Sequence, residues 1–108
     1  MELLDLPLIV RQDVRDVLAY TKQRFGPAKA SEYADLILEA LEDLARDPQS
    51  GHRRADIHSD AWVYPIKKPG RHARHMFLYE IVEGTVRVYG FVYDGRNLSV
   101  QWRNRSPQ

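Results

Sequence analysis

Hydrophobic residues recur every three or four positions over residues 8–46, which is the spacing of amphipathic α-helices. We expect a first helix over residues 8–24 and a second over residues 27–46, separated by Gly26 and begun again by Pro27. The apolar positions of the first helix are Val10, Val14, Val17, Leu18, Thr21 and Phe25. Those of the second are Ala30, Tyr33, Ala34, Ile37, Leu38, Leu41, Leu44 and Ala45. So short a joint forces the two helices to lie antiparallel, as a helical hairpin.

After residue 60 the pattern changes to runs that are rich in β-branched and aromatic residues. Three strands are expected, over residues 61–67, 74–82 and 85–93. Pro69-Gly70 and Glu83-Gly84 are typical turn sequences and would connect these strands as hairpins. The helical hairpin cannot bury its apolar stripe alone, so it is expected to pack on this sheet.

The remaining segments are less regular. A short strand is expected over residues 2–5, before Pro7 begins the first helix. Residues 49–60 form a polar loop, and residues 94–108 form either a short extra strand or a helical turn. The order β-α-α-β-β-β predicts an α+β fold, in which an N-terminal helical hairpin packs on a small, mainly antiparallel sheet.

The composition narrows the class of protein. A chain of 108 residues is expected to form one domain, and 44% hydrophobic with 29% charged residues is typical of a soluble globular protein. The lack of cysteine excludes disulfides and thiolate metal sites. His52, His58, His72 and His75 do not have the spacing of a metal site, so neither a metal nor another cofactor is expected. The apolar runs are too short for a membrane span and no signal sequence is evident, which predicts a cytoplasmic location.

The net charge of +1 conceals a division between the two halves of the chain. Residues 1–47 hold six Lys and Arg against ten Asp and Glu, or −4, whereas residues 48–108 hold ten against five, or +5. Such asymmetry indicates a polyanion or an acidic partner for the C-terminal half. The alternative is that the helices simply carry solvent-facing carboxylates. The residues interpreted in that way are Asp13, Asp16, Asp35, Glu39 and Glu42.

A set of residues in the hairpin and strands has a recognisable order and spacing. The hairpin carries Tyr20, Phe25-Gly26, Ala30, Tyr33, Leu41, Leu44, Pro48 and Gly51, and the strands carry Arg74, His75 and Tyr79. With these motifs, residues 2–102 closely resemble the ParE/RelE superfamily of bacterial toxins, in its ParE-like branch. The chain departs from that family at the basic turn after the last strand, which often reads His-x-Arg-Arg-Asp and here reads "YDGRN" over residues 93–97.

The resemblance implies the toxin of a type II toxin–antitoxin pair, held inactive by a cognate antitoxin. ParE-like members inhibit DNA gyrase and are not known to need catalytic residues. RelE-like members are ribosome-dependent endonucleases that cleave mRNA, and this remains the alternative activity. A third alternative is a protein of the toxin fold that has lost its toxicity and only binds the antitoxin.

Candidate site residues gather in "KKPGRHARH", residues 67–75, and beyond it. RNA cleavage would need a base, an acid and cations on the phosphate, for which the candidates are Arg74, His75, Arg87 and Arg96. The adjacent lysines 67 and 68 would point to opposite faces of a strand, which makes catalysis less favoured than binding. The candidates for binding an antitoxin or a target are Lys67, Arg71, His72, Arg74, Arg96 and Trp102.

Two of these candidates could equally have a purely structural role. His75 alternates with Phe77 and Tyr79, so its ring would also suit a half-buried core histidine. Trp102 aligns with a late tyrosine of the RelE-like nucleases but has no hydroxyl group, and it would equally suit simple packing. For the antitoxin, both helix-in-groove contact and strand addition are open, with arginines pairing to its carboxylates.

Overall fold

A computed structural model describes residues 4–66, 75–93, 95 and 97–107 of the chain. Along the sequence its elements are β1 (Leu4–Asp5), α1 (Leu8–Phe25), α2 (Pro27–Arg46), the 3₁₀ turn η1 (Pro48–Ser50), β2 (His52–Arg53), β3 (Trp62–Pro65), β4 (His75–Val82), β5 (Thr85–Tyr93) and α3 (Leu98–Arg105). Over the described residues these are three α-helices and a five-stranded mixed sheet, which confirms the α+β class.

The strands form one sheet in the order β1-β5-β4-β3-β2. β1 runs parallel to β5, whereas the other neighbours are antiparallel. The β4–β5 hairpin is the longest ladder, from His75 opposite Tyr93 to Val82 opposite Thr85. Its two turn residues, Glu83 and Gly84, have φ values of 51° and 80°, the left-handed conformation that a tight hairpin turn requires. This turn was correctly predicted.

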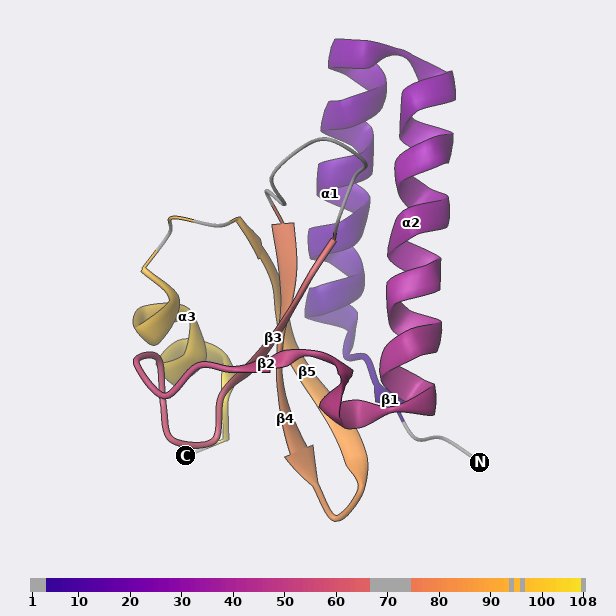
Figure 1. Ribbon diagram of the computed structural model, residues 1–108. Coiled ribbons are helices and arrows are strands. Elements are labelled where there is room, and N and C mark those ends of the chain that lie inside the picture. Colours follow the sequence, from indigo (N-terminus) through magenta and orange to yellow (C-terminus); the bar gives the residue numbers. More distant parts are fainter. Residues whose placement is uncertain (1–3, 67–74, 94, 96, 108) are drawn as a thin grey trace.

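The short connection between α1 and α2 determines the helical hairpin. Gly26 adopts φ 94°, a conformation open to glycine, and its N–H donates to the carbonyl oxygen of Lys22 (2.9 Å), which ends α1. Pro27 then occupies the first turn of α2, where a missing N–H costs nothing. The chain therefore reverses within one residue, and α1 and α2 stand side by side, as expected (Figure 1).

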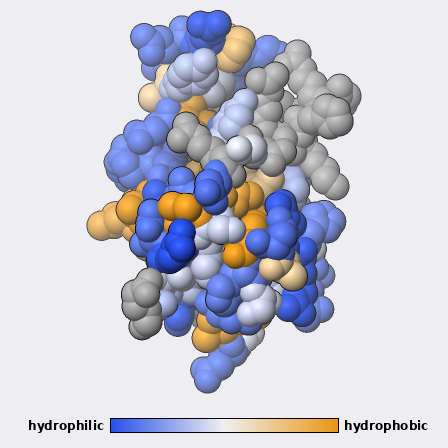
Figure 2. Space-filling view, turned by 90° about the vertical axis from the view of Figure 1, so that its left-hand side faces the viewer, coloured by the Kyte–Doolittle hydropathy of each residue, from blue (hydrophilic) through white to orange (hydrophobic). Residues whose placement is uncertain are grey.

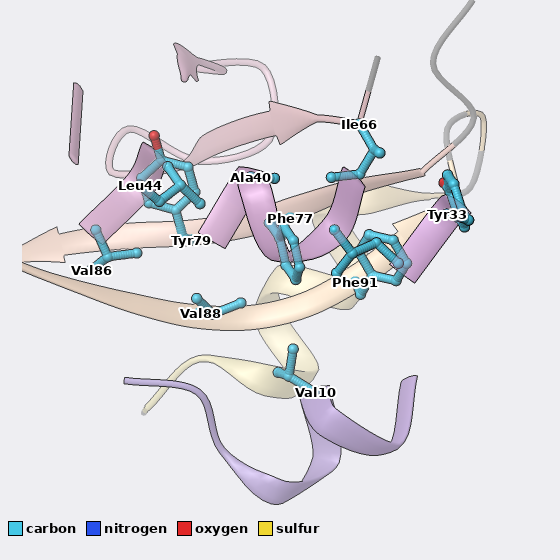
Figure 3. Close-up of a cluster of buried hydrophobic side chains, with 11 residues drawn as sticks. Val10, Tyr33, Ala40, Leu44, Ile66, Phe77, Tyr79, Val86, Val88 and Phe91 are labelled. Atoms are coloured by element: carbon cyan, nitrogen blue, oxygen red, sulfur yellow. The ribbon is translucent and has the colours of Figure 1, made fainter. Parts of the chain in front are cut away.

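The sheet has a helical layer on each face (Figure 1). α1 and α2 cover one face over a core that consists of Val10, Tyr33, Ile37, Ala40, Leu44, Ile66, Phe77, Tyr79, Val86, Val88 and Phe91. Figure 3 shows side chains from both helices and from the sheet converging in this cluster. α3 and the segment before β3 cover the opposite face over a second core of Ile57, Ala61, Val63, Met76, Leu78, Tyr89, Val92, Leu98 and Trp102.

Several details differ from the expectation. The polar loop over residues 49–60 contains β2 and part of η1, and the C-terminal segment, left open between strand and helical turn, is the helix α3. β3 ends at Pro65, so it is shorter than residues 61–67. Phe25 and Leu38 were wrongly placed on the buried faces of the helices, since these residues are 63% and 57% exposed. The apolar stripe of each helix is thus wider than the surface that the sheet covers.

Candidate functional site

The structure locates three of the predicted site residues, His75, Arg87 and Trp102. The other candidates lie outside the described residues, and their roles stay predictions: Lys67, Arg71, His72, Arg74 and Arg96.

His75 begins β4 and sits in a cluster of aromatic rings. Its Nδ1 is 2.8 Å from the hydroxyl of Tyr33 on α2. Its ring stacks on Phe91, with 5.3 Å between the centroids, and meets Tyr93 edge-on at 5.4 Å. Burial raises the pKa of Tyr33 to about 12, so its hydroxyl stays protonated at neutral pH. This packing fits the interpretation of His75 as a half-buried histidine that joins the hairpin to the sheet.

Arg87 lies at the other end of the same β-hairpin. It is paired with Glu80 across β4 and β5, whereas His75 is paired with Tyr93. The two pairs lie five residue steps apart along β4, which at about 3.3 Å per step is about 16 Å between their backbone positions. Arg87 and His75 therefore do not meet at one phosphate.

Arg87 lies beside two polar residues that interact with each other, Glu80 and Tyr89. The hydroxyl of Tyr89 donates to Glu80 Oε1 (2.5 Å), and burial, with the hydrogen bond to Glu80, raises the pKa of Tyr89 to about 12. Arg87 acts on the same phenol in the opposite direction and lowers that pKa. Arg87 thus interacts with polar residues of the sheet itself.

Trp102 on α3 is packed into the second core. Trp102 is only 5% exposed, and its ring meets that of Tyr89 edge-on, with 4.9 Å between the ring centroids. His58 stacks on the indole at 5.1 Å. Burial on this scale supports the packing interpretation of Trp102, because little of the ring is left for a partner.

The sequence interpretation of Asp13 as a solvent-facing charge was wrong. Asp13 on α1 pairs with Arg105 on α3, with Oδ2 and Nη1 3.0 Å apart and both side chains 21% exposed. The same carboxylate accepts a hydrogen bond from the N–H of Phe91 (3.2 Å), and Arg105 Nη1 also donates to the carbonyl of Tyr89 (3.1 Å). Two outward backbone groups of β5 are therefore satisfied by side chains, beyond the point where β1 stops covering that edge.

Near the opposite edge of the sheet, β3 ends in a proline beyond the short stretch that β2 covers. β2 pairs with β3 only at Trp62 and Val63. The N–H of Ile66 donates to the carbonyl of His75 (3.0 Å), so strand alternation directs the backbone of Pro65 to the outer edge. Proline has no N–H to offer an added strand. The part of β5 beyond β1 and the part of β3 at Pro65 are therefore not suited to strand addition.

Apolar surface is nevertheless available. The large hydrophobic side chains left exposed are Leu8, Ile9, Tyr20, Phe25, Leu38 and Tyr93, and most of them belong to the helical hairpin. On the face that carries α3, Figure 2 shows mostly hydrophilic side chains around hydrophobic ones gathered in the middle. A partner protein could pack its own apolar side chains on this surface without adding a strand to the sheet.

No group of His, Asp and Glu among the described residues is arranged to hold a metal ion. In the same part of the chain, no helix combines the length and the apolar character needed to cross a bilayer. The chemistry at hand is that of arginine, histidine, tyrosine and carboxylate side chains.

Comparison with known families matches residues 9–97 to the family described as the ParE toxin of the type II toxin–antitoxin system parDE. The chain belongs to the ParE toxin family. The match takes in the helical hairpin and strands β2 to β5 and ends one residue before α3, so the ion pair of Asp13 with Arg105 joins the matched region to a helix beyond it. A search of curated proteins finds no match. Membership of a type II toxin–antitoxin family implies an antitoxin protein as partner, as the resemblance had suggested.

Proposed function

We propose that this ParE-family toxin inhibits DNA gyrase in the cytoplasm and that a cognate antitoxin neutralises it. Family membership supports the toxin role and the antitoxin partner. Gyrase is proposed because the chain resembles the ParE-like branch, whose members act on that enzyme without known catalytic residues.

One observation weighs most strongly for gyrase over mRNA cleavage. Among the four candidate nuclease residues, the structure describes His75 and Arg87, whose backbone positions lie about 16 Å apart along the strands, at opposite ends of the β4–β5 hairpin. A base and a cation that act on one phosphodiester must both lie within hydrogen-bonding reach of it. The described chemistry is therefore better suited to binding than to RNA cleavage.

The antitoxin would bind through packed side chains. On β5, Asp13 and Arg105 occupy two outward backbone groups, and on β3 Pro65 lacks an N–H, so these stretches are poorly suited to receive an added strand. Exposed apolar residues of α1 and α2, such as Phe25 and Leu38, would instead receive the apolar face of an antitoxin helix. The candidate arginines outside the described residues would pair with its carboxylates.

The proposal is tested with purified toxin on gyrase. We expect the free toxin to inhibit DNA supercoiling or to trap gyrase on cleaved DNA, and equimolar antitoxin to remove the effect. Primer extension on translated mRNA, run with the same preparation, should show no discrete cuts. Gyrase that stays fully active, or cuts in the mRNA, would exclude the proposal, and a lack of growth arrest on expression would favour a non-toxic antitoxin-binding protein.

A further inference from the structure

A small hollow lies between α2 and β3, and none of the candidate site residues that the structure describes is among its lining residues. Its volume is about 190 Å³. Small-molecule sites usually measure about 300–1,000 Å³, so this hollow is of a size for a single side chain. The residues that line it are Leu36, Glu39, Ala40, Asp43, Ser50, His52, Tyr64, Pro65 and Ile66.

The lining is amphipathic. Leu36, Ala40, Pro65 and Ile66 provide apolar walls, and Glu39 and Asp43 bring two carboxylates from successive turns of α2. An apolar wall with an acidic end is suited to an arginine or lysine side chain, whose methylene stem packs on carbon while its charged head stays polar.

The two carboxylates differ in what they already bind. Asp43 accepts a hydrogen bond from the hydroxyl of Tyr64 (2.8 Å) and pairs with Arg46. Glu39 is exposed and makes no hydrogen bond or ion pair with the described part of the chain. Glu39 is therefore the carboxylate that is open to an incoming cation.

The pKa of Tyr64, one of the lining residues, is affected by both carboxylates of the hollow. Its pKa is raised to about 12, first by burial, then by its hydrogen bond to Asp43, and further by the charges of Asp43 and Glu39. Arg46 lowers that pKa but does not cancel the effect. Burial is the largest cause of the raised pKa, and the further contributions of Asp43 and Glu39 agree with the two carboxylates that line the hollow.

We propose that this hollow receives one cationic side chain of the antitoxin, and arginine in preference to lysine. A planar guanidinium can donate to Glu39 while its stem lies on the apolar walls. The edge of β3 supports a side-chain contact here, because Pro65 offers no N–H to a passing strand. The inference rests on the antitoxin partner of the proposed function, but it does not depend on gyrase as the target.

The test uses full-length toxin and the protein encoded by the reading frame beside its gene. Glu39→Gln keeps the size of the side chain and removes its charge, and Glu42→Gln removes the same charge one turn away on α2, outside the hollow. We expect Glu39→Gln to weaken antitoxin binding about tenfold. Glu42→Gln should weaken it by less than about twofold, since an exposed charge acts only through a screened field.

A second arm identifies the cation. Each arginine and lysine of the antitoxin is replaced by methionine, and binding is measured to the wild-type toxin and to Glu39→Gln. One arginine should cost about tenfold with the wild-type toxin and almost nothing with the variant. Equal losses for Glu39→Gln and Glu42→Gln, or no arginine or lysine that couples to Glu39, would overturn the proposal; a coupled lysine would overturn the preference for arginine.

The gyrase assay separates this inference from the proposed function. Glu39→Gln toxin, free of antitoxin, should inhibit gyrase as the wild type does and should unfold at the same temperature, because Glu39 is exposed. If wild-type toxin leaves gyrase active, the target is wrong while the binding result stands. If Glu39→Gln alone loses inhibition, the hollow contacts the target and the antitoxin assignment is wrong.

Discussion

Asp13 and Arg105 are 92 residues apart in the sequence and form an ion pair of 3.0 Å across the edge of β5. The pair also satisfies the backbone N–H of Phe91 and the carbonyl of Tyr89. It therefore ties α1 and α3, which cover opposite faces of the sheet, to the strand β5.

Arg105→Ala should lower the free energy of unfolding by about 1–3 kcal/mol. Removal of the guanidinium leaves Asp13 without its ion-pair partner and the carbonyl of Tyr89 without a donor, both in a mostly buried place. Urea unfolding of the variant measures the loss. Arg46→Ala is the matched control, since its ion pair with Asp43 involves an arginine side chain that is 73% exposed, and it should cost less than about 0.5 kcal/mol. Equal losses in the two variants would contradict a structural role for the pair.

Local patterns predicted the parts of the fold that local physics determines. The helical hairpin follows from the apolar spacing and from Gly26 with Pro27, and the β4–β5 hairpin from its alternation and its Glu83-Gly84 turn. Periodicity shows which face of a helix is apolar but not how much of that face a neighbour covers. Phe25 is left exposed for that reason.

Long-range relationships could not be predicted in this way. Asp13 has the spacing of a surface carboxylate on α1, and only the packing of α3 brings Arg105 to it. A signal for α3 was present, since the side chain of Asn97 accepts a hydrogen bond from the N–H of Val100 (3.3 Å), and asparagine is a favoured N-cap residue. The acidic hollow was not predictable, because it needs α2 and β3 to be placed together.

Gly51→Ala should destabilise the fold by about 1–3 kcal/mol. A Cβ at this position would clash with the hydroxyl of Tyr79 and the carbonyl oxygen of Val63. The hydroxyl cannot move aside cheaply, because it donates to the carbonyl of Pro48 (2.7 Å). Thermal unfolding provides the measurement, with Ser50→Ala as the neighbouring exposed control. If Gly51→Ala unfolds at the wild-type temperature, the close approach of these segments is not a constraint on the fold.

Trp102→Ala distinguishes packing from recognition. Loss of the buried indole from between Tyr89 and His58 should cost about 3–5 kcal/mol of folding free energy. Tyr93→Ala is the contrasting change, because that side chain is exposed at the end of β5 and its loss should affect stability far less. Calorimetric unfolding and antitoxin binding are measured for both variants. A Trp102→Ala protein with wild-type stability and lost binding would assign the indole to a binding site instead.

Stability should fall as the pH rises from about 10 to about 12. Four tyrosines have a pKa raised from 10.0 to about 12, chiefly by burial: Tyr33, Tyr64, Tyr79 and Tyr89. Below pH 10 both folded and unfolded chains keep these phenols protonated, so their contribution to stability is fully present. Above it the unfolded chain loses protons that the folded chain still holds, and the contribution is lost through the folded pKa near 12. Urea unfolding at stepped pH values tests this, with Tyr33→Phe expected to show a shallower decline because one titrating phenol is gone. A stability that stays constant across the interval would contradict the burial of these hydroxyls.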